Sequence, residues 1–472
     1  MVKQSRSVRI TAILTIFLLA ACTVGPDYRK PDVAELVPND WRWKPAAAQD
    51  AVPKGEWWKA FGDPVLDRLE ATALGANPTL RAAVARVDEA RAVARLARSQ
   101  FYPQVTLDAS AKRERTSGNL PTPIPFNVPA ANFNTFTLPL DLSYEIDLWG
   151  RVRRSLESAR AQAEASVSDQ QNVLLTLTAD VAINYFLVRT LDAEIATLRG
   201  TLDSRADSLR ILEERFAAGV ALGADVEQAR TQLAIAQTDL ADVRRQRAET
   251  VDALAVLCGK PPSAFELEQR PLQAREITMP AILPSELLER RPDIARAERA
   301  LAARNAQIGV ARAAYFPSVQ LIGQAGFLSE DASRLLSADS RVWSIGPRIS
   351  LPIFTAGRTA ADVQRAEAVY EEALADYRLA VLIAFREVED SLAQIVLRGE
   401  QSHAQDAAVR SASNVLSLAR ARYQAGTVTY LEVADAERNL LQQARRQAQL
   451  QGQRYASMVR LVKALGGGWE SN

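Results

Sequence analysis

Hydrophobic residues follow two different periods along the chain, and each period returns in the second half. Between Phe136 and Ile146 every second residue is apolar, and threonine, aspartate, serine and glutamate fill most of the positions between them. The same alternation covers residues 105–109, and a less regular version covers 319–327 and 343–351. A period of two is typical of a strand with one apolar and one polar face. We therefore expect amphipathic strands at about 104–114, 134–148, 317–329 and 341–353.

A long proline-free run follows each pair of strands. Residues 151–216 and 358–423 contain no proline and one glycine each, and alanine, leucine, arginine, glutamate and glutamine dominate them. These residue types favour α-helix, and at a rise of ~1.5 Å per residue each helix would reach roughly 100 Å. Each run ends at a glycine turn, Gly219 or Gly426, and a second helical run follows it. The sequence therefore predicts two long antiparallel helical hairpins.

The positions of glycine and proline indicate that one unit is used twice. Three pairs of glycines have the same separation in sequence: Gly150 and Gly357, Gly219 and Gly426, and Gly259 and Gly466. Each unit also begins with a helix whose first residue is a proline, Pro78 or Pro292, where the missing N–H costs nothing. Such self-similarity predicts an internal tandem repeat, with units at 71–272 and 286–468. The remaining segments are a leader at 1–21, an N-terminal segment at 22–70, a linker at 273–285 and a tail at 469–472.

The composition excludes several classes of partner and site. The chain has 57 Lys and Arg against 56 Asp and Glu, so its charge gives no electrostatic basis for binding nucleic acid. His403 is the only histidine in the sequence. We find no G-x-S-x-G elbow, no H-E-x-x-H, no phosphate-binding glycine loop and no paired-cysteine metal spacing. We therefore expect no enzyme, no metal site and no cofactor other than a covalent lipid.

The N-terminus has the features of a targeting segment. Basic residues precede an apolar run that is too short for an ordinary membrane-spanning helix. The run ends with the letters LAAC at 19–22, which resemble a bacterial lipobox, where the leader is cut before the cysteine. By this resemblance Cys22 carries diacylglycerol and palmitate, and Thr23 in place of an aspartate indicates sorting to the outer membrane. An ordinary small-residue cleavage site with a chance cysteine is the alternative. We expect Cys258 to be a small buried hydrophobic residue.

The strands predicted for one chain are too few to form a closed barrel. Strands with one apolar and one polar face suit a membrane barrel with lipid outside and water inside, and an open edge in lipid leaves N–H and C=O groups unpaired. Four strands cannot enclose a lumen, whereas three chains would supply twelve. A soluble β-hairpin packed on helices is the alternative. In the barrel arrangement the loop from Thr116 to Asn132 lies outside the cell, and Trp149 lies near the inner membrane–water boundary.

Several segments together resemble a known family. They are CTVGPDYRKP at 22, WWKAFGDPVLDRL at 57, YEIDLWGRVRR at 144, LPSELLERRPDI at 283, YFPSV at 315, GRTAADVQRAEA at 357 and RYQAGTVTYLEVADAERNL at 422. In this order, and with both repeats represented, the chain resembles the outer-membrane factors of tripartite efflux systems, the TolC-like channels. Within that family it is most similar to the OprM-like, NodT-type lipoprotein branch.

The resemblance implies a fold and a set of partners. The implied fold is mainly α with membrane β: a homotrimer in which a tunnel of long antiparallel helices continues a 12-stranded β-barrel, with four strands from each chain. The barrel would lie in the outer membrane and the tunnel in the periplasm. A periplasmic adaptor and an inner-membrane pump, of RND type, would deliver substrate that passes through unchanged. An outer-membrane component of type I protein secretion is the alternative function.

The resemblance also implies which residues form the periplasmic gate. They lie at the hairpin tips, just before or beyond the turns at Gly219 and Gly426, and are Asp225, Tyr423, Glu432 and Asp435. Threefold symmetry would turn Glu432 and Asp435 into acidic rings that favour cations. Acids in a first helical turn also complement the helix dipole, which is the alternative reading of the same residues. Val428 replaces an arginine that helps to hold the closed state in TolC, so another contact must do so here, with Tyr423, Arg422 or Arg215 as candidates.

Two other interpretations stay open at this point. A periplasmic adaptor is also a helical-hairpin lipoprotein, but it has one hairpin inserted in β domains, whereas this sequence predicts two in tandem. The aromatic residues Trp57, Trp58 and Phe61 could line a ligand pocket. We expect them instead to pack the N-terminal segment onto the waist of the tunnel, because aromatic anchors bury a large area.

Overall fold

The computed structural model describes residues 23–38, 40–42, 55–118, 130–272 and 290–467. The leader at 1–21, Cys22, the linker at 273–285 and the tail at 469–472 therefore lie outside the described residues, as does most of the loop between Thr116 and Asn132. The chain is mostly helical with one small sheet.

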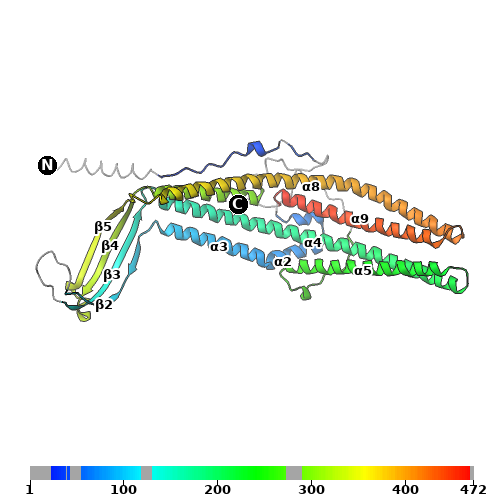
Figure 1. Ribbon diagram of the computed structural model, residues 1–472, viewed down its shortest axis with the longest axis horizontal. Coiled ribbons are helices and arrows are strands. Elements are labelled where there is room, and N and C mark those ends of the chain that lie inside the picture. Colours follow the sequence, from blue (N-terminus) through cyan, green and yellow to red (C-terminus); the bar gives the residue numbers. More distant parts are fainter. Residues whose placement is uncertain (1–22, 39, 43–54, 119–129, 273–289, 468–472) are drawn as a thin grey trace. The chain divides into compact units, whose positions relative to one another are not determined.

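From Pro78 and again from Pro292, a helix, antiparallel strands and a pair of long helices follow one another in the same order (Figure 1). The helices of the first half are α2 (Pro64–Ala76), α3 (Pro78–Ser99), α4 (Arg151–Ala217) and α5 (Gly223–Leu257). Those of the second half are α7 (Pro292–Ala313), α8 (Arg358–Gln424) and α9 (Tyr430–Ala464). The strands are β1 (Gln104–Leu107), β2 (Ser110–Arg115), β3 (Asn132–Ile146), β4 (Ser318–Ser329) and β5 (Arg341–Ser350). Short 3-10 helices include η2 (Trp57–Phe61).

The lengths of the paired helices agree between the two halves. Helices α4 and α8 have 67 residues each, and α5 and α9 have 35 each. We call α4 with α5 hairpin 1, and α8 with α9 hairpin 2. The chain divides into two compact units, which are described separately below: a sheet unit (residues 1–31, 87–166 and 297–377) and a helical unit (32–86, 167–296 and 378–472).

In the sheet unit the strands pair antiparallel in the order β1-β3-β4-β5, and β2 also pairs with β3. The strand expected at 104–114 is interrupted at Asp108 and Ala109, so it appears as β1 and β2 in one continuous register with β3. The interruption lies opposite Pro139 of β3, which has no N–H to donate to the ladder. Asp108 N–H still donates to the Pro139 carbonyl at 3.1 Å.

The alternation of apolar residues produces one continuous apolar face on this sheet. Val105 lies beside Leu142, Leu142 beside Gly323 and Gly323 beside Ile345, so four neighbouring strands carry small or apolar residues in one row. Several residues of this face are exposed on the single chain, and Ile345 is 63% exposed. Within the described residues, the outer edges of β5 and of β1 and β2 have no strand partner.

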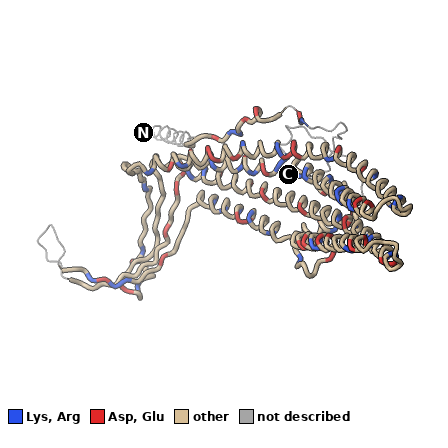
Figure 2. The backbone as a smooth tube through the Cα atoms, turned by 45° about the vertical axis from the view of Figure 1, so that its right-hand side comes forward, with Lys and Arg blue, Asp and Glu red and all other residues tan. Residues whose placement is uncertain are grey.

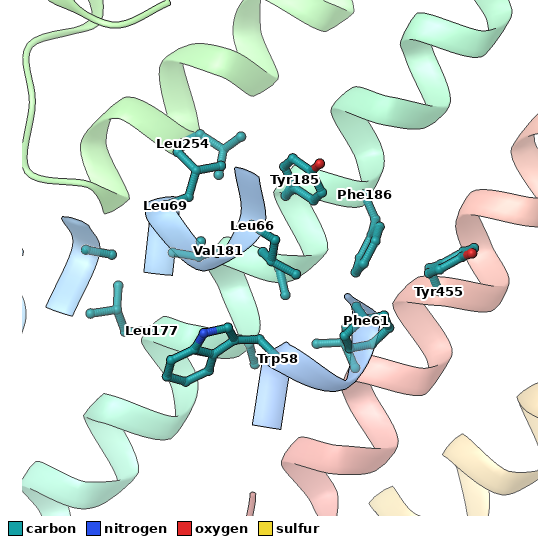
Figure 3. Close-up of a cluster of buried hydrophobic side chains, with 14 of the residues drawn as sticks. Trp58, Phe61, Leu66, Leu69, Leu177, Val181, Tyr185, Phe186, Leu254 and Tyr455 are labelled. Carbon is teal, nitrogen blue, oxygen red and sulfur yellow. The ribbon is translucent and has the colours of Figure 1, made fainter. Parts of the chain in front are cut away.

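The core of the helical unit forms around η2 and α2. Trp57, Trp58 and Phe61 are buried between α4, α5 and α9, and Phe61 packs on Phe186 and Tyr455 with ring centroids 4.9 and 6.1 Å away (Figure 3). Asp63 caps α2: its carboxylate accepts from the Val65 N–H at 2.9 Å and from the Tyr185 hydroxyl at 2.5 Å. These aromatic residues therefore fill a core and do not line an open pocket, and Cys258 is buried in the same cluster.

One acid, Glu70, lies inside this core without a hydrogen-bond partner among the described residues. Glu70 of α2 is completely buried, and neither of its carboxylate oxygens has a hydrogen-bond partner among the described residues. Burial raises the pKa of this carboxyl to about 9, and the nearby Asp67 charge adds to the shift. Glu70 is therefore a neutral acid at pH 7.

Helix α4 contains a stretch of 18 residues with a mean hydropathy of 1.3, apolar enough to cross a membrane by composition. In the structure 61% of that stretch is buried inside the protein. The apolar residues of α4 therefore serve packing against the neighbouring helices, which is the usual reason for such a stretch in a core helix.

Candidate functional site

The two hairpin turns have the same backbone structure. Gly219 and Gly426 adopt φ angles of +73° and +72°, which favour glycine. In hairpin 1 the Val220 N–H donates to the Arg215 carbonyl at 2.9 Å, and in hairpin 2 the Thr427 N–H donates to the Arg422 carbonyl at 3.0 Å. Both turns are thus Schellman caps, which satisfy the last carbonyls of a helix. Both glycines predicted from the sequence lie at the turns between the paired helices.

The two tips contact each other through an apolar cluster. Leu212, Val226 and Ala229 of hairpin 1 pack with residues of hairpin 2 that include Leu416 and Val433. Tyr430, the first residue of α9, is only 3% exposed and lies in the same cluster. Burial raises the pKa of Tyr430 to about 12, so its hydroxyl stays neutral.

An aromatic contact joins the tips at their surface. The Arg215 guanidinium of hairpin 1 lies 5.5 Å from the ring centroid of Tyr423 in hairpin 2. The Tyr423 ring meets the Tyr430 ring edge-on, with centroids 5.8 Å apart. A cation over a ring face is attracted by the ring quadrupole, typically by about 0.5–2 kcal/mol. Of the three residues that the sequence suggested as a replacement for the missing arginine at Val428, Arg215 and Tyr423 are therefore in contact with each other.

The acidic residues at the tips have different surroundings. Glu432 forms an ion pair with Arg422 at 3.4 Å, and Asp435 forms one with Arg438, and all four side chains are exposed. Each potential acidic ring thus has a basic residue beside it, which reduces its net charge. For Asp225 of hairpin 1, no ion pair is seen within the described residues. The structure therefore brings together Tyr423, Arg422 and Glu432 at one tip and leaves Asp225 on the other.

Deeper between the hairpins lie charged contacts that the sequence did not reveal. Arg420 of α8 donates to Glu437 Oε1 at 2.7 Å and to Ser204 Oγ of α4 at 2.8 Å. Arg445 of α9 reaches Glu194 of α4 and Asp239 of α5, each at 3.2 Å. Figure 2 shows basic and acidic residues recurring along the helices, so no local motif distinguishes Arg420 and Arg445 from the others.

Arg205 of α4 is the most deeply buried of these cations. It is 2% exposed and donates to the Gln232 carbonyl at 2.6 Å. Burial lowers its pKa, and Glu437 opposes that shift. Arg205 and Gln232 line a groove of about 550 Å³ between α4, α5 and α9, together with Asp239, Arg438 and Arg445. The charged residues that line this groove are one acid, Asp239, and four arginines, Arg205, Arg438, Arg445 and Arg446.

Within the described residues, no group of three or more His, Cys, Asp or Glu side chains could hold a metal ion. What the tips offer is a pair of helical hairpins held together by apolar packing, one cation–π contact and ion pairs.

Comparison with known proteins identifies the family. The model of the outer membrane efflux protein family matches residues 69–260 and 283–467, which is most of the chain. The chain belongs to the outer membrane efflux protein family. Members of this family are channels and not enzymes. The two matched segments of this efflux protein contain one helical hairpin each.

Relatives match along their full lengths. The pyoverdine export outer membrane protein OpmQ of Pseudomonas aeruginosa is 37% identical over 470 residues, which cover 98% of this chain and 97% of OpmQ. The solvent efflux pump outer membrane protein SrpC of Pseudomonas putida is 36% identical over 468 residues, 97% of each chain. The crystal structure of the CmeC outer membrane channel of Campylobacter jejuni superposes with a TM-score of 0.89 at 26% identity, covering 95% of this chain and 96% of CmeC. This efflux protein therefore shares the fold of outer membrane channels.

Proposed function

We propose that the chain is the outer-membrane exit channel of a tripartite efflux system, which passively conducts substrates delivered by an inner-membrane pump of RND type and a periplasmic adaptor. The observation that carries the proposal is the family match over both halves of the chain, together with full-length relatives that are named for efflux or export. The proposed role is conduction, so no residue is required to react with the substrate.

Small organic compounds are the proposed substrates. The relatives include outer membrane proteins of solvent efflux and of pyoverdine export. Both names refer to small molecules, and this favours efflux over the secretion of a polypeptide by a type I system.

A homotrimer is the proposed assembly. In the described sheet, β5 on one side and β1 with β2 on the other have outer edges without a strand partner. Such edges are not tolerated in a lipid environment. Three copies would pair each open edge with the next and close a 12-stranded barrel, with the row from Val105 to Ile345 facing lipid.

We propose that the two helical hairpins descend from a tandem repeat and form the wall of a periplasmic tunnel. Equal helix lengths in the two halves and matched turns at Gly219 and Gly426 support this proposal. The tips then form the entrance. Asp225, Tyr423, Glu432 and Asp435 are the proposed gate residues, and the contact between Arg215 and Tyr423 is the proposed closing contact.

Cys22 is the proposed lipid attachment site, with diacylglycerol and palmitate anchoring the mature N-terminus in the outer membrane. The lipobox-like sequence at 19–22 supports it. The waist of the tunnel is then completed by the N-terminal segment, whose residues Trp57, Trp58 and Phe61 are buried.

The proposal is tested by fractionation and by conductance. We expect the purified outer membrane to contain the protein as a trimer that migrates differently before and after heating in detergent, and we expect the trimer to form pores in planar bilayers. Deletion of the gene should sensitise cells to solvents or small toxic compounds. A monomeric protein in the soluble periplasmic fraction, with no conductance, would overturn the proposal.

A further inference from the structure

The groove of about 550 Å³ in the helical unit has a mainly basic lining. Residues of α4 and α5 of hairpin 1 and of α9 of hairpin 2 line it. We call it the arginine groove, because its charged residues are four arginines and one acid: Arg205, Arg438, Arg445, Arg446 and Asp239. Its volume is within the range of small-molecule sites. The groove is therefore large enough for an organic ligand.

Two of the four arginines already have carboxylate partners. Arg445 pairs with Glu194 and Asp239, each at 3.2 Å. Arg438 pairs with Asp435 of its own helix. Asp239, the acid of the described lining, is thus engaged by Arg445. The positive charge that remains in the groove belongs to the other two arginines.

Arg205 is buried in the lining with part of its guanidinium unpaired. It is 2% exposed and donates through Nη1 to the Gln232 carbonyl at 2.6 Å. Its Nε has no hydrogen-bond partner among the described residues. Glu437, whose charge acts on Arg205, forms its ion pair with Arg420 instead. Because an unsatisfied buried donor is costly, above all on a charged group, Arg205 lacks an acceptor that a ligand could supply.

Gln232 of α5 brings a second unsatisfied group to the same groove. This residue is 3% exposed, and its Oε1 has no hydrogen-bond partner among the described residues. A glutamine amide has an acceptor and donors in one plane, so a half-turn of the amide presents N–H groups to an anion. Two buried polar side chains thus line one groove with hydrogen-bonding capacity that the described residues do not use.

The other side of the groove offers one more cation and an apolar surface. Arg446 of α9 is exposed and forms no ion pair within the part of the chain that the structure describes. Ile235 of α5 and Leu441 of α9 are the aliphatic residues of the lining. Such side chains favour contact with the carbon skeleton of a ligand. The groove therefore suits an organic anion better than an inorganic ion.

We infer that the arginine groove binds a small organic anion, whose carboxylate or phosphate group accepts hydrogen bonds from Arg205 and is attracted by Arg446. An oxyanion is the fitting ligand because the planar guanidinium matches the geometry of carboxylate and phosphate oxygens. Arg205 belongs to hairpin 1 and Arg446 to hairpin 2. The bound anion would therefore hold the two hairpins together.

Hydrogen exchange on the purified full chain in a non-ionic detergent tests the site. The probes are benzoate, phenyl phosphate and the neutral benzamide, at equal concentration and ionic strength. A ligand that binds only the closed hairpins, at about ten times its dissociation constant, slows exchange through their separation about tenfold. We expect this slowing around the groove in α4, α5 and α9 with either anion, and none with benzamide.

Removal of the arginines should weaken the response to the anions. Arg205→Met should weaken benzoate binding at least about tenfold, because it removes a buried charged donor. If this variant does not assemble, Arg446→Gln changes an exposed residue and should weaken binding about threefold to fivefold. Arg244→Gln is the matched control for Arg446→Gln: it removes an exposed arginine of α5 that does not line the groove, so binding should remain as in the wild type.

Gln232→Glu tests the groove without any added ligand. The substitution keeps the size of the side chain and places a fixed carboxylate in the lining. We expect the hairpins of this variant to exchange slowly on their own, as the wild type does with benzoate, and benzoate to have no further effect. If Gln232→Glu opens more readily than the wild type, the site is overturned, because a buried carboxylate destabilises when it has no cationic partner.

The remaining outcomes also decide the question. A response to benzoate alone, or to phenyl phosphate alone, would support the site and identify its ligand as a carboxylate or a phosphate. Equal slowing by benzamide and benzoate, equal losses in Arg244→Gln and Arg446→Gln, or no response of the wild type to either anion would overturn the site. None of these results would change the conductance expected of the proposed exit channel.

Discussion

The two hairpin tips share a backbone and differ in what their side chains contact. Position by position around the turns, Arg215 corresponds to Arg422, Phe216 to Tyr423, Gly223 to Tyr430 and Asp225 to Glu432. Arg422 stays at its own tip and pairs with Glu432, whereas Arg215 reaches across to the Tyr423 ring of the other tip. Phe216 is 53% exposed and its ring covers Gly223. The two tips thus have the same backbone turn, but the arginine of hairpin 2 pairs within its own tip, whereas the arginine of hairpin 1 contacts the other tip.

The difference shows that two turns with the same backbone can make different side-chain contacts. A Schellman turn needs glycine and a helical carbonyl, and both tips retain these. The side chains beyond the turn differ: the second tip has the buried Tyr430 where the first has Gly223. Tyr430 in the apolar cluster and Tyr423 at its surface, with Arg215 as the complementary cation, therefore distinguish the second tip from the first.

Removing the buried ring should have the largest effect. Tyr430→Ala leaves a cavity in the cluster between the hairpins, so we expect the opening free energy of the tip to fall by about 3–5 kcal/mol. Hydrogen exchange of the amides from Val433 to Ala436 would measure it. Tyr430→Phe should cost only about 1 kcal/mol, because it keeps the buried ring and removes the hydroxyl alone. Equal losses in both variants would show that the ring is not what matters.

Loss of the cation–π contact between Arg215 and Tyr423 should have the second largest effect. Tyr423→Ala removes the cation–π partner of Arg215, which at about 1 kcal/mol corresponds to a roughly fivefold shift toward separated tips. Single-channel recording would detect it as a higher open probability, and Tyr423→Phe should retain most of the closed state. Phe216→Ala is the matched control at the other tip. A Phe216→Ala channel that opens as readily as Tyr423→Ala would remove the asymmetry between the tips.

The turns themselves should respond equally. Gly219→Ala and Gly426→Ala each place a Cβ at positive φ in open space. Each substitution should therefore lower the free energy of unfolding by about 1–2 kcal/mol, and the loss should be the same at both turns. Asparagine tolerates this conformation better, and Gly→Asn at either turn should cost less than alanine. Limited proteolysis at the tips would rank the variants. Unequal costs at the two turns would contradict the view that the backbones are equivalent.

The exposed charges should have the smallest effect. Glu432→Ala with Asp435→Ala should lower the cation selectivity of the channel in planar bilayers without preventing trimer assembly. Because Arg422 and Arg438 already face these acids, Arg422→Ala with Arg438→Ala should raise cation selectivity. Both changes should shrink in high salt, which screens exposed charges. Unchanged selectivity in both assembled double variants would leave only the interaction of the acids with the helix dipole.

The long helices and the turns could be predicted from the sequence because their signals are local. The proline-free run from Arg151 and the glycine at 219 determine where α4 and its turn occur, whatever surrounds them. The alternation of apolar residues likewise placed the strands. It did not predict the interruption at Asp108, because the cause lies on the partner strand at Pro139.

The contacts of the candidate site depend on how the hairpins are arranged, so the sequence predicted them only in part. The sequence could suggest Arg215, Arg422 and Tyr423 as partners, but not which arginine meets the tyrosine. That choice depends on which side of each helix faces the other hairpin. Tyr430 was missed because a tyrosine at the first position of a helix gives no local sign of burial.

Glu70 links the folding of the helical unit to the uptake of a proton. Its carboxyl is neutral in the folded core up to about pH 9, whereas in an unfolded chain it ionises near its ordinary value of 4.5. The pKa is raised by folding, so the contribution of Glu70 to stability is greatest below pH 4.5 and falls as pH rises toward 9, by at most about 1.4 kcal/mol per pH unit. Glu70→Gln should remove this slope in unfolding measurements across that interval, since glutamine never ionises. Alkaline conditions should therefore weaken the core of the helical unit around η2 and α2.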